Sequence, residues 1–145
     1  MLFLMVLILP SCFEQPDCLL NNTNILKITL KGKTLEKDTT VQFLSIRALE
    51  AESELYANKL LGTIQVPLLI RDTIATVVFD YTEKSQLVSD TLVVSYRNQT
   101  RVISPDCGAY IYQVGVTIPK TNFEKTRVTT PTLLTTVTKN LEIFL

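Results

Sequence analysis

The sequence contains no histidine and no tryptophan, and it has only four glycines. Histidine is the commonest general base and the commonest metal ligand among protein side chains. Its absence excludes a Ser-His-Asp triad, a Cys-His dyad and a histidine-based zinc site within this chain. So few glycines leave no glycine-rich loop of the kind that holds phosphates. The sequence therefore predicts a protein that is not an enzyme, with no cofactor and no metal site.

A net charge is missing as well, because 14 Lys and Arg residues balance 14 Asp and Glu residues. Proteins that bind nucleic acid normally present a basic face, and so do polybasic membrane-binding segments. The balance of charge therefore argues against nucleic-acid binding and against a polybasic membrane-binding segment. The apolar fraction of 46% suits a folded domain, and a length of 145 residues corresponds to one domain.

The first residues, Met1–Leu9, read MLFLMVLIL and contain no polar side chain. This run is too short to span a bilayer, which needs about 20 residues, but it has the length of the apolar core of an export signal. Pro10-Ser11-Cys12 follows. An apolar run, a small residue and then a cysteine resembles the lipobox of bacterial lipoproteins, in which the cysteine is acylated and becomes the first residue. Pro10 and the lack of a preceding Lys or Arg depart from that pattern.

We therefore expect a signal peptide over residues 1–11, a lipidated Cys12 with a tether over residues 12–23, and a single β-domain over residues 24–145. Acyl chains on Cys12 would supply the membrane affinity and place the protein at the bacterial cell envelope, on its periplasmic or surface face. Two alternatives remain open. Leu2–Leu9 could be a buried first strand with Cys12 as a free core thiol, or the run could be a simple cleaved secretory signal.

The three cysteines are Cys12, Cys18 and Cys107, an odd number that leaves one unpaired in an exported protein. Acylation of Cys12 would leave Cys18 and Cys107 as a pair, which is permitted to oxidise outside the cytoplasm. Such a disulfide would close a loop of about 90 residues, worth up to roughly 4–5 kcal/mol from chain entropy. The alternative is two inert buried thiols.

The rest of the chain reads as short strands rich in β-branched and aromatic residues. Pro67 predicts an edge strand or a bulge. Asn98-Gln99 predicts a two-residue hairpin turn, and residues 48–62 predict a loop with at most a short helix. The expected strands are residues 25–31, 40–48, 64–70, 74–81, 90–97, 100–104, 109–118, 125–129 and 141–145. This spacing predicts an all-β antiparallel sandwich, Ig-like or related, of about 7–9 strands, with a barrel as the alternative.

Several short motifs occur in a recognisable order. They are Cys12, Asp17-Cys18, Val66-Pro67-Leu68, Asp90–Tyr96, Asp106-Cys107-Gly108, Thr121–Glu124 and Lys139–Ile143. Together they resemble a family of small Bacteroidetes lipoproteins of unknown function. The resemblance covers nearly all of the mature chain and implies an envelope lipoprotein with a sandwich-like domain. It implies no activity, substrate or catalytic residue.

Two groups of side chains are candidate sites. Four aspartates could form an acidic pair or hold Ca²⁺, but no calcium-loop motif exists and turns explain them better; they are Asp72, Asp80, Asp90 and Asp106. Five tyrosines could form a sugar-binding platform: Tyr56, Tyr81, Tyr96, Tyr110 and Tyr112. Tyr110 and Tyr112 share the expected face of residues 109–118 with Val114, Val116 and Ile118, which predicts core packing instead.

The sequence thus favours a non-catalytic, lipid-anchored envelope protein that acts as a binding or accessory subunit with envelope protein partners. One alternative is a carrier of a lipid or other hydrophobic ligand, which would need an apolar cavity. The other is a hydrolase that uses a pair of carboxylates, a chemistry that needs no histidine.

Overall fold

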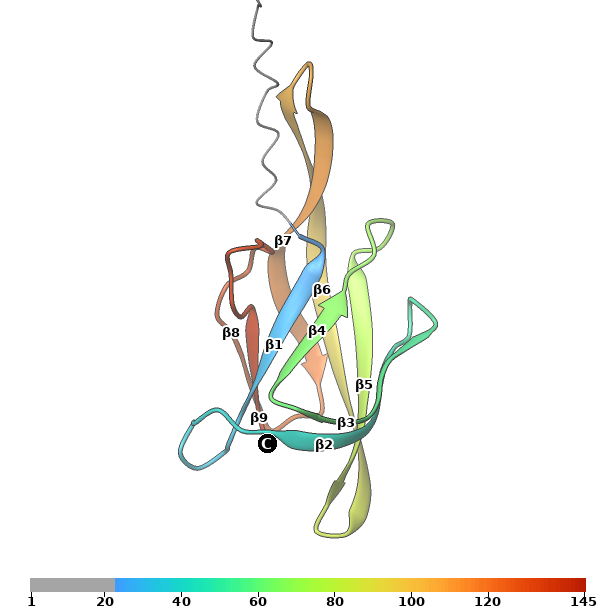
Figure 1. Cartoon of the computed structure of the whole chain (residues 1–145), viewed down its shortest axis with the longest axis vertical. Coiled ribbons are helices and arrows are strands. Elements are labelled where there is room, and N and C mark those ends of the chain that lie inside the picture. The colour runs from blue at the N-terminus through green and yellow to red at the C-terminus, as the bar shows by residue number, and fades with distance from the viewer. Residues whose placement is uncertain (1–22) are drawn as a thin grey trace, which may run out of the picture.

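A computed structural model describes residues 23–145, which fold into nine β-strands arranged as two facing sheets (Figure 1). The strands are β1 (Ile25–Lys31), β2 (Val41–Ala48), β3 (Ser53–Leu61), β4 (Thr63–Pro67), β5 (Ile74–Glu83), β6 (Gln86–Ser104), β7 (Gly108–Thr121), β8 (Lys125–Val128) and β9 (Leu141–Phe144). These described strands contain no closed barrel, so the predicted all-β sandwich is confirmed and its barrel alternative is not.

The first sheet has the strand order β4-β1-β9-β8, and the second has the order β3-β2-β5-β6-β7. Every strand pair is antiparallel except β1 with β9, which run parallel. The first and last described strands are therefore neighbours in the middle of the four-stranded sheet. β4 lies at an edge of that sheet, as Pro67 predicted.

The core lies between the sheets and follows from the alternation of apolar residues along the strands. In β1, Leu26, Ile28 and Leu30 are fully buried, while the residues between them are half-buried on the opposite face. Opposite them, Phe43 and Phe79 pack with their ring centroids 6.0 Å apart. We call the face of the four-stranded sheet that points away from this core its outer face.

The prediction for residues 48–62 was wrong, because Ser53–Leu61 forms the edge strand β3. Most of its side chains are half-buried or exposed, so the segment lacks the apolar alternation that marks a strand. Its strand conformation comes instead from antiparallel pairing with β2. Asn58 has a positive φ of 50°, which breaks the regularity of this edge.

The predicted turn at Asn98-Gln99 was also wrong, because β6 runs without interruption from Gln86 to Ser104. A type I′ hairpin turn needs φ above zero at both central positions, and Gln99 adopts that conformation poorly. Asn98 has another role, since its side-chain nitrogen donates to the carbonyls of Ile70 and Asp72, each at 2.7 Å. The chain reverses later, just before Gly108, whose φ is 73°.

The expected single apolar face of residues 109–118 is divided by a β-bulge at Gly115, whose φ is 66°. Arg97 pairs with Val114 but Ser95 pairs with Thr117, so β7 carries an extra residue there. One extra residue turns all following side chains to the other face. Val116 therefore lies in the core, whereas Tyr110 and Tyr112, which precede the bulge, lie on the opposite face of β7.

The far halves of β6 and β7 form a two-stranded hairpin that projects from one end of the sandwich (Figure 1). β5 pairs with β6 only as far as Ser95, so beyond this point β6 has β7 as its sole strand neighbour among the described strands. We call residues 97–114 the arm. β1 begins at the same end of the sandwich (Figure 1).

Candidate functional site: a charge network on the outer face

The last strand, β9, is unusual because all four of its residues are buried. Leu141 and Ile143 belong to the core between the sheets. Glu142 and Phe144 point to the outer face, because successive side chains of a strand alternate. A buried carboxylate is costly unless cations and hydrogen-bond donors surround it, so the surroundings of Glu142 define the site.

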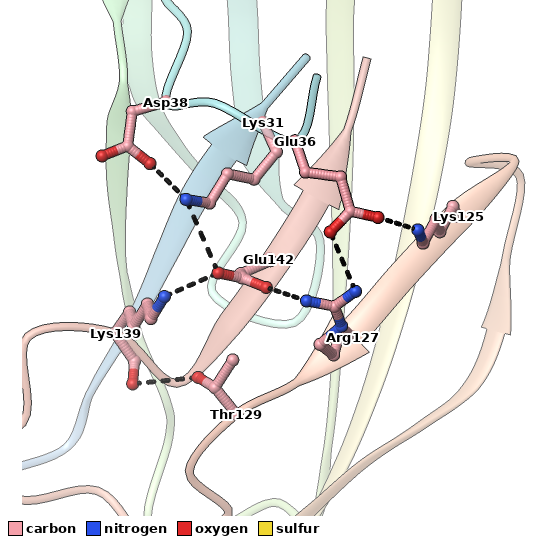
Figure 2. A network of polar contacts seen from close by, with 8 residues as sticks. All are labelled: Lys31, Glu36, Asp38, Lys125, Arg127, Thr129, Lys139 and Glu142. Carbon is pink, nitrogen blue, oxygen red and sulfur yellow. Dashed lines mark hydrogen bonds and ion pairs between the residues drawn. The ribbon is translucent and has the colours of Figure 1, made fainter. Parts of the chain in front are cut away.

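Three cations surround the Glu142 carboxylate, whose side chain is only 4% exposed (Figure 2). The Lys139 ammonium lies 2.6 Å from Oε1 and Arg127 Nη1 lies 3.2 Å from Oε2. Lys31 Nζ lies 3.8 Å from Oε1. The strand register explains the positions of two of these cations. Arg127 of β8 pairs directly with Glu142. Lys31 is two positions after Thr29, the β1 residue that pairs with Glu142, and therefore lies on the same face.

The loop between β1 and β2 adds two more carboxylates to the network (Figure 2). Glu36 contacts Lys125 and lies 3.2 Å from Arg127 Nη2, so Arg127 joins Glu36 to Glu142. Asp38 lies 2.5 Å from Lys31 Nζ. Lys31 therefore joins Asp38 to Glu142 in the same way, and the loop is fixed over the outer face by paired charges.

Phe144 lies beside this network and is 1% exposed. Lys125 Nζ is 4.5 Å from its ring centroid and Arg127 Cζ is 5.2 Å from it, both within the range of cation–π attraction. Both charged groups lie over the ring. The same side chains therefore bury an aromatic ring and neutralise carboxylates.

The charges of the network lower the pKa of its acids. The Lys139 hydrogen bond holds the pKa of Glu142 below its ordinary value, against the opposing effect of burial. Hydrogen bonds from Lys125 and Lys31 lower the pKa values of Glu36 and Asp38 respectively. A general acid in hydrolysis needs a raised pKa, so these carboxylates suit permanent ion pairing rather than proton transfer.

A polar cleft of about 380 Å³ lies next to Asp38. Its walls are mainly threonines: it is lined by Thr29, Asp38, Thr39, Thr40, Gly62 and Thr63. This cleft is largely open to solvent, unlike the enclosed apolar cavity expected of a carrier of hydrophobic ligands. Residues 23–145 contain no cluster of three or more Asp, Glu or Cys side chains placed to hold a metal ion.

Two of the three predicted covalent sites, Cys12 and Cys18, lie outside the described residues. Cys107 lies at the tip of the arm, where it is partly buried and its backbone N–H donates to Ser104 Oγ at 3.0 Å. The lipidation and the Cys18–Cys107 disulfide therefore stay predictions.

The four aspartates do not converge on one site. Asp80 and Asp90 lie within β5 and β6 rather than in turns, where Asp80 pairs with Arg47 at 3.0 Å and Asp90 accepts from the Tyr81 hydroxyl at 2.6 Å. Asp72 precedes β5, and Asp106 is exposed at the tip of the arm. Their roles are local.

Four of the five tyrosines fall into two groups, and the fifth, Tyr56 of β3, is partly buried against the core. Tyr81 and Tyr96 are buried in the core, at 6% and 1% exposure. Tyr110 and Tyr112 are half-buried on the arm, outside the core. Their predicted core packing was wrong, because the bulge at Gly115 separates them from Val116.

The charge network itself was missed from sequence. One signal was present, since Glu142 interrupts the otherwise apolar strand LEIF near the C-terminus. Lys125 and Arg127 alternate on β8 as well, which is the spacing of one strand face. Nothing in the sequence showed that the loop carrying Glu36 lies over the same face, because that contact spans about 90 positions.

The fold and this network define a two-sheet β-sandwich with a paired-charge outer face. Residues 39–145, which include eight of the nine strands, match a family described as a family of unknown function (DUF6452). The chain belongs to this family. No curated protein and no solved structure is significantly similar to the chain. In the described part of the chain, no helix has the length and hydropathy to cross a membrane.

Proposed function

We propose that the chain is the precursor of a lipid-anchored envelope protein of bacteria, related to Bacteroidetes lipoproteins, whose sandwich is a non-catalytic binding or accessory domain. The observation that carries the proposal is Met1–Leu9 followed by Ser11 and Cys12, an export-signal core that ends at an acylatable cysteine. Acyl chains there give stable membrane attachment when more than one is present.

The cysteine count supports the same assignment. Acylation of Cys12 leaves Cys18 and Cys107 to form one disulfide in an oxidising compartment. Cys107 lies at the tip of a two-stranded arm, and isolated two-stranded hairpins are only marginally stable. A covalent link there would stabilise a hairpin in which each strand has a single neighbour among the described strands.

The chemistry of the domain supports binding rather than catalysis. The clustered carboxylates Glu36, Asp38 and Glu142 are each paired with a cation, and their pKa values are lowered rather than raised. A carboxylate hydrolase needs one acid whose pKa is raised and a second that is free to act as nucleophile or base. The network lacks the acid that this mechanism needs.

The test is mass spectrometry of the full chain after expression in a bacterial host with a functional lipoprotein pathway. We expect a mature N-terminus at Cys12 that carries acyl chains, and loss of acylation in Cys12→Ser. Cys18→Ser is the matched control and should still be acylated. An unmodified chain that begins at Met1 would refute the anchor. A non-reducing peptide map of the same sample should contain a peptide pair joined through Cys18 and Cys107.

A further inference from the structure

The arm exposes a surface that no other described strand covers. On one of its faces, Arg97 pairs with Val114, Gln99 with Tyr112 and Arg101 with Tyr110. On the other face, Val102 is 70% exposed and Ile111 is 44% exposed. An element with aliphatic, aromatic and cationic side chains on two open faces has the composition of a contact surface.

The arm carries positive charges along its length and a negative charge only at its tip. Arg97 and Arg101 form no ion pair with any residue of the described chain. Asp106, at the turn, is the sole acidic residue between positions 97 and 114. In contrast, Arg127 and Lys125 are held by carboxylates. The arm therefore offers guanidinium groups that are available to an external anion.

This combination matches the interfacial region of a membrane. Tyrosine rings settle at the headgroup level, where the ring is in an apolar environment and the hydroxyl is wet. Arginine binds phosphate through a planar fork of donors. Val102 and Ile111 lie on the opposite face of the arm and take no part in this contact. The face with Arg97 and Arg101 thus presents two cations, unpaired within the described chain, beside two tyrosines, and this charge is complementary to an anionic lipid surface.

The position of the arm agrees with this assignment. Asn24 exchanges hydrogen bonds with Leu68 just before β1, and Tyr96 and Asn98 at the base of the arm bind the carbonyls of Leu69 and Ile70. The chain that leads back to Cys12 therefore enters at the base of the arm. Ile25 is thirteen positions after Cys12, a span of at most about 45 Å, whereas the arm extends about 25 Å beyond its base. The anchor therefore reaches far enough for the tip of the arm to contact the same membrane.

We propose that the arm is seated on the anionic lipid surface of the membrane to which Cys12 is anchored, with Tyr110 and Tyr112 at the headgroup level. This inference rests on the proposed lipid anchor and adds the orientation of the domain. The Cys18–Cys107 disulfide would enforce it, since only six positions separate Cys18 from Cys12, a span of about 20 Å at most. The opposite end of the sandwich, with the β5–β6 turn, then faces away from the lipid.

The absence of tryptophan provides a clean reporter, because any introduced tryptophan is the sole one in the chain. The full chain carrying Tyr110→Trp is purified in its lipidated form and reconstituted into vesicles that contain brominated lipids, which quench tryptophan by contact. Tyr112→Trp is a second arm variant in case the first does not fold. Leu87→Trp is the matched control, since Leu87 is 71% exposed and lies beside the β5–β6 turn at the far end. Flotation of the vesicles measures anchoring separately.

We expect quenching of the arm variants to be several-fold stronger than that of Leu87→Trp. Arg97→Gln with Arg101→Gln should reduce the seated population roughly tenfold in vesicles that contain phosphatidylglycerol. Lys59→Gln with Lys84→Gln, which removes the same charge elsewhere, should leave quenching unchanged. Equal quenching at both ends in protein that floats overturns the seated arm and leaves the anchor standing. An arm that is shielded by self-association or by a protein partner would also show no excess quenching, and this result likewise overturns the seated arm alone. A chain that does not float overturns both proposals.

Discussion

The side-chain oxygen of Asn140 lies 3.0 Å from the backbone nitrogen of Lys27, although 113 positions separate the two residues. The Asn140 backbone N–H donates in return to the Lys27 carbonyl at 2.7 Å. The Asn140 side-chain nitrogen donates to the carbonyls of Thr130 and Thr132, each at 3.1 Å. One buried amide therefore joins the residue just before β9 both to β1 and to the loop between β8 and β9.

Replacing this amide should be costly for stability. In Asn140→Ala, one backbone N–H and two carbonyls lose their partner at a site that is 1% exposed. We expect the free energy of unfolding to fall by about 2–3 kcal/mol, measured by urea denaturation. Gln86→Ala, at an exposed position, is the control and should change stability by less than about 0.5 kcal/mol. Equal effects of the two substitutions would contradict the role given to Asn140.

Glu142 should give the fold an acid-dependent stability. Its pKa is lower in the folded state than the ordinary value of 4.5, because Lys139 hydrogen-bonds the carboxylate. The stabilisation is thus fully present above about pH 4.5 and is lost as the pH falls through the folded pKa. Glu142→Gln should be less stable than wild type at neutral pH by about 1–3 kcal/mol, and the difference should shrink in acid. Unfolding curves between pH 7 and pH 2 measure it.

The matched control for this prediction is Glu124→Gln. Glu124 pairs with Lys33 at 3.3 Å, but its side chain is 77% exposed, so water competes with the ion pair. We expect a loss of less than about 0.5 kcal/mol at neutral pH. A pH profile of Glu142→Gln that runs parallel to wild type would show that Glu142 does not contribute to the acid dependence.

Tyr81 should make the stability of the fold depend on pH at the alkaline end of the range. Burial, together with its hydrogen bond to Asp90 at 2.6 Å, raises the pKa of the Tyr81 hydroxyl above the ordinary value of 10.0. The stabilisation is complete below pH 10 and is lost as the pH rises toward the folded pKa. Tyr81→Phe should lose about 1–2 kcal/mol at pH 7 and show a weaker decline above pH 10. Tyr96→Phe is a useful comparison, because Tyr96 has a raised pKa but donates to a neutral carbonyl.

Replacing Gly115 by alanine, which adds only a methyl group, should destabilise the fold. Its φ of 66° disfavours any residue with a Cβ, and a Cβ there would lie 3.2 Å from Arg97 Nε. We expect Gly115→Ala to destabilise the fold by about 1–2 kcal/mol. Gly108→Ala shares the positive φ but meets no atom within 4 Å, so it isolates the backbone cost. Gly32→Ala has neither problem and should be nearly neutral. Thermal unfolding of the three variants tests this order.

Sequence patterns predicted the fold class because the buried strands obey simple alternation. β1 is the clearest case, with Leu26, Ile28 and Leu30 inward. The same reasoning failed at β3, which is held by pairing with β2 and has few buried side chains. It failed again at Gly115, where one extra residue reverses the face of the strand.

The charge network was less accessible to sequence reasoning than the fold. Glu142 could be noticed as a carboxylate within an apolar strand, but its meaning depends on Lys31 and Arg127, which come from β1 and β8. Periodicity describes neighbours along one strand and contains no information on which distant strands meet. The parallel pairing of β1 with β9, which brings Lys31 beside Phe144, is a property of the topology.

That parallel pairing also sets an order of events during biosynthesis. β1 lies between β4 and β9, and β9 consists of residues 141–144. The four-stranded sheet therefore stays incomplete until residues 141–144 have been synthesised. Pairings between such distant segments form slowly, because much chain entropy is lost before the contact compensates. We therefore expect the β1–β9 ladder to form after local hairpins such as β5–β6, whose strands are joined by a short turn.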